Sequence, residues 1–546
     1  GRVSDLRNVA ANQRITVKQS ESTKATPAPS SPVRQVVADI TSRTTFPFVH
    51  HENAYVDFDR ERLMPKMLST EGPLMAVADV NGDGLDDIFI GGAKEQPSAI
   101  LIQQPDGSFA RSNEKLLAQD SVSEDIGAVF FDANGDHHLD LYVATGGSEY
   151  SEAAPALEDR LYLNDGKGNF KKAVGAIPPL SISGSRVAAA DFDGDGAIDL
   201  FVAGRSVPGR YGIDPQSVLL KNDGRGHFSD MTDAAAPGLS HIGMVTDAAW
   251  VDSDGDGRQD LVLVGEWMPI TIFHNAGRGK LAKMEVRGLE KSNGWWNRIV
   301  AGDFTGDGKV DFIAGNLGLN TRLQAGPNEP ATMYVKDFAH NGFLQQIISY
   351  FNHGKAYPLT LRDDLIKSLP SLKDRYRNYG DYARLTMAEV FPEKDLDDAV
   401  VKSAYTFATS LVKNNGDGSF TLVPLPLEAQ ISPMYGILAG DFEMKGRTDL
   451  MMAGNFDLVK PELGKMSAGY GVYLRGDGKG HFTPVLTRES GFLVPGQARD
   501  IQRVRTRNGT IYIVSRNNDR PLIFAKNSAP ASAGAELKTP ADRLGH

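Results

Sequence analysis

Five short loops of this chain place acidic or amide residues at every second position between two apolar runs. The clearest copy, DFDGDGAID at residues 191–199, has carboxylates at loop positions 1, 3, 5 and 9 and a glycine at position 6. Like charges this close repel one another, so the loop needs a cation. Ca2+ takes six to eight oxygen ligands at about 2.3–2.6 Å, and alternate residues of a tight loop point to one centre. The spacing therefore predicts a calcium loop.

The same ligand pattern recurs in all five loops: side chains at positions 1, 3, 5 and 9, and the backbone carbonyl at position 7. The predicted ligands are Asp79, Asn81, Asp83, Leu85 and Asp87; Asp132, Asn134, Asp136, His138 and Asp140; Asp191, Asp193, Asp195, Ala197 and Asp199; Asp252, Asp254, Asp256, Arg258 and Asp260; and Asp303, Thr305, Asp307, Lys309 and Asp311. Helical EF-hands need a glutamate at position 12, where this chain has apolar residues such as Val202. The predicted sites are therefore strand–loop–strand sites. The alternative is a set of Asx turns that close the loops without metal.

Composition limits the possible partners. The chain has 546 residues with a net charge of −11, which argues against a nucleic acid held through its phosphates. About five Ca2+ ions would offset most of that charge. There is no cysteine, so disulfides and cysteine nucleophiles are excluded, and no apolar run is long enough to span a membrane. The first residues lack an initiator Met and a signal-peptide core, which suggests a piece of a longer chain.

The loops belong to one internal repeat with a period of roughly 50–60 residues. Each unit has a strand, the Asp loop and a second strand, followed by a hairpin with a Gly-rich turn such as NDGKGNF. Four short strands per unit predict an all-β propeller. Counting hairpins favours eight blades, and counting Asp loops gives seven. A sixth loop, at Asp441, has Lys445 at position 5 and is predicted to bind no calcium; a seventh repeat, placed at Asp500, has lost its acids.

Three segments fall outside the repeat. Residues 19–39 are rich in Ser, Thr and Pro and are expected to form a linker, and residues 527–546 a disordered tail. The propeller is then expected at 40–526, with its last blade closed by a strand from residues 45–62. Between Asp303 and Asp441, the spacing of apolar residues at 362–391 is helical, which predicts a helical insertion at about 355–400.

The loops DVNGDGLDD and DFDGDGAID, with flanking IGG and VAG, resemble the FG-GAP/VCBS repeats of integrin-α-type propellers. Residues 1–18 resemble the end of an ASPIC/UnbV module, as found in the cartilage-acidic-protein-like family. Segments such as NGWWNRIVAGDF and GNLGLN resemble large bacterial members with tandem propellers. The resemblance implies a calcium-stabilised, extracytoplasmic protein, secreted or at the bacterial cell surface or outer membrane. It names no ligand.

No GxSxG, P-loop or HExxH motif occurs in the sequence, so no catalytic residues are predicted. We expect a non-enzymatic binding or scaffold protein with protein or glycan partners, and an accessory subunit of an outer-membrane complex is one form that it would take. A calcium-assisted polysaccharide lyase is the alternative. Trp295 and Trp296 are a possible ligand surface on which sugars would stack; otherwise they wedge between blades.

Overall fold

The computed structural model describes residues 35–527 as one continuous span, together with residues 2–3, 16, 18, 20 and 23–24. Most of the predicted module at 1–18, the first part of the linker at 19–39 and nearly all of the tail at 527–546 lie outside the described residues. Near the N-terminus, β1 (Arg2–Val3) pairs with β2 (Thr23–Lys24). In the described residues, no helix is long and apolar enough to cross a membrane.

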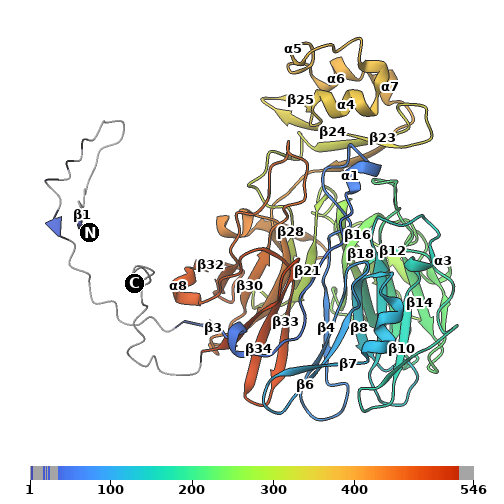
Figure 1. Cartoon of the computed structure of the whole chain (residues 1–546), viewed down its shortest axis with the longest axis vertical. Coiled ribbons are helices and arrows are strands. Elements are labelled where there is room, and N and C mark those ends of the chain that lie inside the picture. Colours follow the sequence, from blue (N-terminus) through green and yellow to red (C-terminus); the bar gives the residue numbers. More distant parts are fainter. Residues whose placement is uncertain are drawn as a thin grey trace, which may run out of the picture.

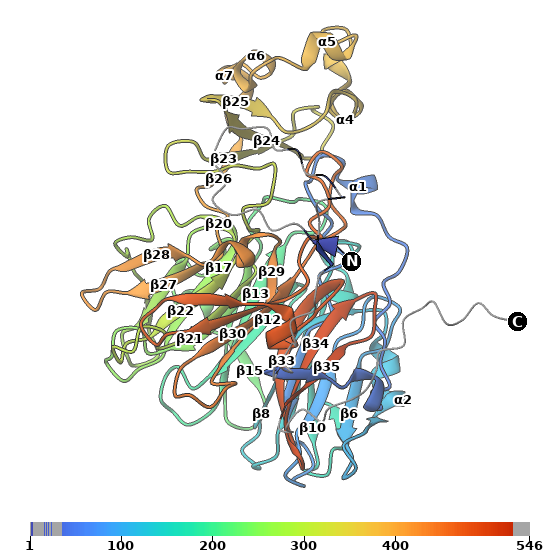
Figure 2. The same ribbon diagram turned by 90° about the vertical axis from the view of Figure 1, so that its left-hand side faces the viewer.

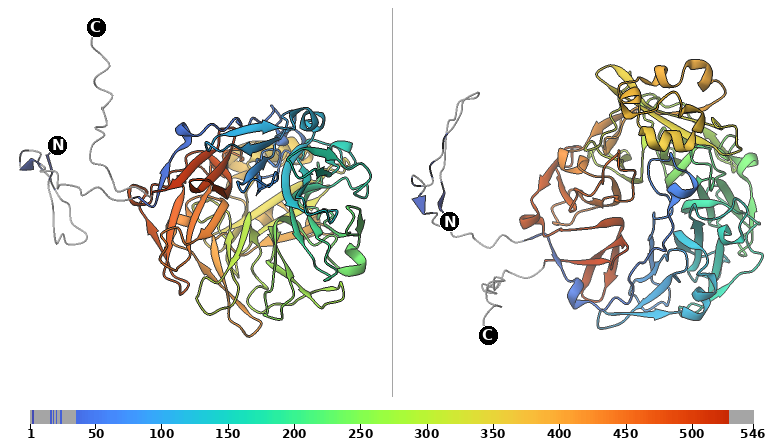
Figure 3. Two further views of the ribbon diagram at one scale, coloured as in Figure 1. Left: turned by 90° about the horizontal axis from the view of Figure 1, so that it is seen from below. Right: turned by 45° about the horizontal axis from the view of Figure 1, so that its top comes forward.

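The span contains eight four-stranded antiparallel sheets, which confirms the predicted all-β propeller class. Seven of these sheets form a closed ring, because their first strands contact one another in the order β4, β8, β12, β16, β21, β29, β33 and back to β4 (Figure 3). The seven blades are numbered in chain order, and the strands of each are given with the innermost first. Blade one is β4 (Met75–Ala78), β5 (Asp87–Ile90), β6 (Ala99–Gln103), β7 (Phe109–Ser112); blade two is β8 (Glu124–Phe131), β9 (Asp140–Gly146), β10 (Arg160–Asn164), β11 (Phe170–Lys172); blade three is β12 (Ser183–Ala190), β13 (Asp199–Ser206), β14 (Val218–Asn222), β15 (Phe228–Asp230); and blade four is β16 (Met244–Val251), β17 (Asp260–Met268), β18 (Thr271–Asn275), β19 (Leu281–Lys283). Blade five is β21 (Arg298–Gly302), β22 (Asp311–Gly315), β27 (Ser410–Asn414), β28 (Phe420–Pro424); blade six is β29 (Met434–Gly440), β30 (Asp449–Gly454), β31 (Val472–Gly476), β32 (Phe482–Val485); and blade seven is β33 (Gln497–Thr506), β34 (Gly509–Asn517), β35 (Leu522–Lys526), β3 (Val37–Asp39).

The eighth sheet reconciles the two blade counts. It consists of β23 (Ala331–Lys336), β24 (Gln345–Asn352), β25 (Lys355–Pro358) and β26 (Val400–Ala404), and it lies between β22 and β27 of the fifth blade in the sequence. In space it stands above one end of the ring, together with helices α4 (Arg362–Ser368), α5 (Tyr379–Tyr382), α6 (Met387–Val390) and α7 (Glu393–Leu396) (Figures 1 and 2). The insertion is thus helical, as expected, but also carries the hairpin that suggested an eighth blade.

The remaining elements are short. β20 (Gly294–Trp295) pairs with β17 at the edge of the fourth blade. The other helices are α1 (Asp57–Arg60), α2 (Glu114–Leu117), α3 (Thr232–Ala235) and α8 (Thr487–Ser490), and 3-10 turns lie at Thr41–Arg43, Ala118–Asp120, Pro155–Leu157, Pro370–Leu372 and Leu427–Gln430.

The ring closes with a strand from the N-terminal side, as expected, but not from residues 45–62. β3 pairs antiparallel with β35, with Val37 opposite Lys526, so the last blade begins before the predicted boundary at residue 40. β3 is the outer strand of this blade, and Figure 1 labels it at the edge of the ring. Residues 45–62 instead form an extended segment with α1 and no strand. Closure by the first strand leaves no blade in the ring without a neighbour on each side.

Residues 61–72 form a plug at the end of the ring that faces the insertion. All but Arg62 and Glu71 are buried, and the segment touches several blades: Met67 N donates to Leu458 O at 3.0 Å, and Thr70 O accepts from Arg499. Apolar residues of this segment, such as Met64, join Trp295 and Met333 in the cluster that seats the insertion on the ring. The plug therefore couples the insertion to the propeller axis.

Two closed quartets of alternating charge lie at the axis. The axial quartet comes from the innermost strands of four blades: Arg186 and Arg298 each reach Asp247 (3.3 and 3.5 Å) and Asp500 (4.0 and 3.4 Å). Its four side chains are at most 14% exposed. Each ion pair joins two different blades, so the quartet links blades that do not share a sheet.

The plug quartet joins the plug to β13 and β17, the second strands of blades three and four. Lys66 reaches Glu71 at 3.3 Å and Glu266 at 2.5 Å, and Arg205 reaches the same two carboxylates at 2.7 and 2.9 Å. Burial alone would raise the pKa of both acids; Arg205 and Lys66 outweigh it and lower the pKa of Glu71 to about 2 and that of Glu266 below its usual range. Both carboxylates are therefore ionised, and the quartet is electrically neutral.

Candidate metal centres

The five Asp loops connect the first and second strands of blades one to five, whereas the insertion connects the second and third strands of blade five. Antiparallel strands place these two kinds of connection at opposite ends, so the Asp loops lie on the face away from the insertion (Figure 1). All five predicted loops thus occupy one face of the ring.

The position-1 aspartate organises each loop through the backbone. One carboxylate oxygen accepts the N–H of position 4 and the other the N–H of position 6; for Asp191 these are Gly194 N at 2.8 Å and Gly196 N at 2.9 Å. The equivalent pairs of bonds occur at Asp79, Asp132, Asp252 and Asp303. The position-5 carboxylate accepts the N–H of position 7, as from Ala197 to Asp195 at 2.9 Å. The Asx turns that the alternative reading invoked are therefore present.

The position-9 aspartate is fully buried in all five loops, namely Asp87, Asp140, Asp199, Asp260 and Asp311. Its carboxylate accepts the N–H of loop position 2 and, at 2.8 Å, a backbone N–H of the blade's third strand, the donors being Gln103, Asn164, Asn222, Asn275 and Asn414. These bonds hold the loop against the hairpin that follows it.

Burial has an electrostatic cost at position 9. It raises the pKa of Asp87 to about 7, of Asp140 to about 6 and of Asp199 to about 7, and neighbouring loop carboxylates add to each rise. Backbone hydrogen bonds only partly oppose this effect. A divalent cation in the loop would stabilise the ionised form, so the charge pattern suits a metal better than an empty turn.

The third-strand asparagine links each loop to the preceding blade. Asn222 Nδ2 donates to Ala133 O, at position 2 of the second loop, at 2.9 Å, while its own backbone N–H is bound by Asp199. Asn164, Asn275 and Asn414 repeat the contact with the loops of blades one, three and four. Sequence reasoning took these asparagines only as turn residues; their regular place before each Gly-rich turn was the available signal. We call this chain of contacts the asparagine relay.

The carboxylates of loops three and four converge. Ligand oxygens of Asp191, Asp193 and Asp199 lie within 4.8 Å of one another, as do those of Asp252, Asp254 and Asp256. These are the two loops with aspartate at position 3; loops one and two have asparagine there, and in loop five Thr305 donates to Asp311 at 3.0 Å. The oxygen-rich donor sets fit a hard cation such as Ca2+.

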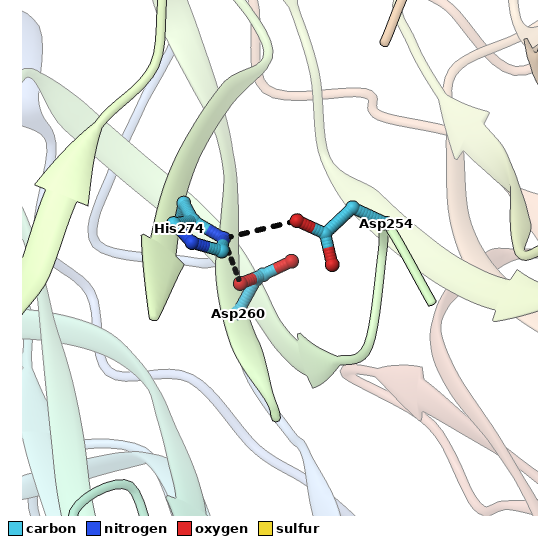
Figure 4. Close-up of side chains that lie close together, drawn as sticks. All are labelled: Asp254, Asp260 and His274. Atoms are coloured by element: carbon cyan, nitrogen blue, oxygen red, sulfur yellow. Dashed lines mark ion pairs between the residues drawn. The ribbon is translucent and has the colours of Figure 1, made fainter. Parts of the chain in front are cut away.

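Basic side chains from the third strand occupy part of these clusters. Lys221 pairs with Asp193 and with Asp195, the latter at 2.8 Å. At the equivalent position of blade four, His274 Nδ1 lies 3.1 Å from Asp254 and 3.2 Å from the buried Asp260 (Figure 4). Blades one and two have Ile102 and Leu163 at this position, so no basic side chain from it pairs with their loops. In loops three and four, a metal ion would therefore compete with Lys221 or His274 for the carboxylates, whereas in loops one and two it would not meet such a competitor.

The degenerate sixth loop is neutralised by its own blade. Glu443, at position 3, pairs with Arg475 at 2.8 Å, with Lys445 at 3.1 Å and with Arg447 at 3.3 Å. Against the effect of burial, Arg475 and Lys445 lower the pKa of Glu443 to about 2. Three basic side chains thus surround the Glu443 carboxylate and neutralise it. This is the charge environment expected of a loop that takes no calcium.

Asp500 does not correspond to the leading aspartates. It lies inside β33 opposite Ser515, next to the same kind of bulge that precedes Asp247 in β16, and it belongs to the axial quartet. The prediction that Asp500 takes the place of a leading loop aspartate in the seventh repeat is therefore wrong. In this blade, the first and second strands join through the tight turn after Thr506.

Trp295 and Trp296 do not form a ligand surface, because they are 1% and 0% exposed. Trp295 packs edge-on against Trp267 and Phe407, with ring centroids 5.2 and 5.7 Å apart, in the cluster beneath the insertion. Trp296 lies in the core between blades four and five, and its Nε1 donates to Ser292 O at 2.8 Å. The alternative, that they wedge between blades, describes Trp296, whereas Trp295 lies between the ring and the insertion.

Comparison with protein families confirms the repeat. Residues 79–143, 146–202 and 252–314 match a family described as an FG-GAP-like repeat. These three stretches contain all five Asp loops, those of blades one to five. The ASPIC/UnbV resemblance has no support from this comparison. No curated protein matches the chain.

Solved structures with a similar arrangement share little sequence. An Agrocybe aegerita lectin that recognises non-reducing terminal N-acetylglucosamine is 14% identical, with a TM-score of 0.40, and the match covers 78% of this chain and 84% of the lectin. The V. cholerae biofilm matrix protein Bap1 is 11% identical, with a TM-score of 0.36 and coverages of 86% and 90%. Saccharomyces cerevisiae Sqt1 is 9% identical, with a TM-score of 0.38 and coverages of 85% and 99%.

Proposed function

We propose that this chain is a non-enzymatic binding scaffold whose blades are fastened by about five Ca2+ ions. The asparagine relay carries the proposal: each loop is bonded to its own third strand and, from blade two onward, to the preceding loop. An ion in one loop therefore orders two blades. Carboxylates held in this way serve as joints between structural units, which leaves partner recognition to other surfaces.

Calcium joints suit an extracytoplasmic location. Modules outside the cell bind Ca2+ with dissociation constants of about 10⁻⁴–10⁻³ M, matched to the higher calcium there. The proposal therefore includes the cell surface, a secreted form or an outer-membrane complex in which this chain is an accessory subunit. Recovery of membrane partners with the calcium-loaded protein would support the last of these.

Calcium stoichiometry tests the joints directly. We expect about five ions per chain after equilibrium dialysis, measured by elemental mass spectrometry. Asp303→Asn removes the leading carboxylate of loop five and should lower the count by one. The matched control is Asp441→Asn in the sixth loop, which should leave the count unchanged. A count unaffected by Asp303→Asn would contradict the assignment of these loops.

The insertion provides the partner surface. Between β24, β25, α4 and α5 it forms a cleft of about 590 Å³ whose lining includes four tyrosines and three arginines and no carboxylate: Tyr350, Tyr357, Tyr379, Tyr382, Arg322, Arg362 and Arg384. Tyr379 is 50% exposed. Aromatic faces and guanidinium groups suit a glycan or a protein segment with negative charge. On a chain of net charge −11, this local excess of arginine is distinctive.

Substitutions in the cleft test the partner surface. Tyr379→Ala and Arg384→Ala should weaken binding to the best ligand of a glycan array at least about tenfold, corresponding to about 1.4 kcal/mol. Arg225→Ala, on the exposed turn of the third blade, is the matched control and should bind as the unmodified chain does. Equal binding by all three variants would place the partner elsewhere. Release of an unsaturated, ultraviolet-absorbing product from uronic polysaccharides would instead establish the lyase alternative.

A further inference from the structure

A small cavity lies on the propeller axis where the two quartets meet. It has a volume of about 40 Å³, and residues of all seven blades and of the plug line it. Among them are Arg186 of the axial quartet and Arg205 and Glu71 of the plug quartet. Arg499 of the last blade completes the charged part of the wall. Three guanidinium groups thus meet one carboxylate around a space that holds only one or two water-sized particles.

The charge of this region does not balance. Each quartet is neutral, since two cations face two carboxylates. Arg499 adds one positive charge: it is 1% exposed, and no carboxylate in residues 35–527 forms an ion pair with it. Its guanidinium instead donates to backbone oxygens, including Thr70 O at 3.1 Å and Asn455 O at 3.0 Å, and stacks on Tyr435 and Phe456.

Glu71, Glu52 and Asp457 act on Arg499 electrostatically, but from beyond ion-pair distance. Glu124 is buried, and no hydrogen bond reaches either of its carboxylate oxygens from the described residues. Burial, followed by the surrounding acids Glu52, Glu149 and Asp57, raises its pKa well above the usual range. Burial likewise raises the pKa of Glu52 to about 7. A buried cation without a counterion is unfavourable unless an anion joins it.

Donors directed at the cavity are available. Arg205 Nη1 is buried and has no hydrogen-bond partner in the described residues, although the other nitrogens of this guanidinium bind Glu71. The side-chain amide of Asn297, another lining residue, also makes no hydrogen bond to the described residues. An unpartnered guanidinium N–H is unfavourable when it is buried, so a ligand that accepts hydrogen bonds is favoured.

We propose that this axial cavity binds one small monovalent anion of the halide class, chloride in solution. The anion neutralises the excess charge of Arg499 and accepts hydrogen bonds from Arg205 and Asn297. Because residues of all seven blades and the plug line the cavity, the anion acts as a structural ligand at the centre of the ring, independent of the calcium loops on the face away from the insertion.

Bromide provides the direct test. Crystals grown with bromide in place of chloride should show an anomalous peak inside the cavity, bounded by Arg186, Arg205 and Arg499. In solution, at constant ionic strength and constant calcium, replacing gluconate by 100 mM chloride should raise the melting temperature by about 2 °C or more. The absence of a cavity peak, together with equal melting temperatures in the two salts, would overturn the proposal and leave only water at this place.

Leu74 allows a variant that carries its own anion. This lining residue occupies the position of the first blade that is equivalent to Arg186 and Asp247 in theirs. Leu74→Asp places a carboxylate beside Arg499 and should abolish the chloride dependence and the bromide peak. The matched control is Leu74→Asn, of the same shape without charge, which should retain both. Retention of the chloride dependence in Leu74→Asp would contradict the proposal even if the crystals showed an ion.

Discussion

Chelation of calcium is expected to lower the melting temperature of this protein by about 10 °C or more. A ligand at a hundredfold excess over its dissociation constant contributes about 2.7 kcal/mol per independent site, and about five sites act on joints in series. Scanning calorimetry with and without EGTA measures the effect. Magnesium is the matched control, because its smaller, octahedral shell suits these loops poorly, so it should restore little. An unchanged melting temperature would show that the Asx turns alone close the loops.

The same experiment has a pH signature. In the folded chain without calcium, burial raises the pKa of Asp87 from 3.8 to about 7 and that of Asp199 likewise. The folded state then holds these protons more tightly than the unfolded state, so stability is greatest below pH 3.8 for these groups and is lost as the pH rises toward about 7. Calcium binds only the ionised carboxylates, so the gain in melting temperature on adding calcium should increase from pH 5 to pH 8. A gain independent of pH would place the ions away from the buried aspartates.

Breaking the plug quartet is the second large effect. Arg205→Met leaves Glu71 and Glu266 to share the single cation Lys66, and removing one partner of a buried ionic network costs about 3–5 kcal/mol. Denaturant unfolding should register this loss. Arg225→Met, at an exposed arginine, is the control and should change stability by less than about 0.5 kcal/mol.

A double variant separates charge from packing. Arg205→Met with Glu266→Met removes one cation and one anion and leaves the pair Lys66–Glu71 intact, so part of the lost stability should return. Tyr211, whose hydroxyl donates to Glu266 at 2.9 Å, loses that acceptor and limits the recovery. If the double variant were less stable than Arg205→Met by the full cost of a second deletion, the two side chains would not act as one network.

The local parts of this fold could be predicted from the sequence, and the long-range parts could not. The Asp loops follow from spacing within nine residues, so their backbone geometry at Asp191 and its equivalents matched expectation. The hairpin at 331–352 has the same local pattern whether it enters the ring or stands above it; only contacts made by Trp295 and Met333 beneath the insertion decide. That ambiguity produced the count of eight blades.

Asp500 illustrates a different limit. Taken alone, an aspartate near a repeat boundary resembles a leading loop residue, and the sequence carries no sign of partners in other blades. Its role depends on Arg186 and Arg298, which are distant in sequence and meet it only at the axis. The asparagine relay was missed for the same reason, since one side-chain amide contacts the preceding repeat.

The pairing of β3 with β35 has a mechanical consequence. Val37 lies opposite Lys526, so the chain enters and leaves the propeller at the same end of one antiparallel pair. Tension applied through the flanking chain would load the backbone bonds of this pair one after another, beginning at Val37, and would peel β3 away instead of shearing it. The last blade is thus expected to open at the lowest force, and the other six blades bear no load until it opens. A ring that is closed in this way opens first at the pair β3–β35.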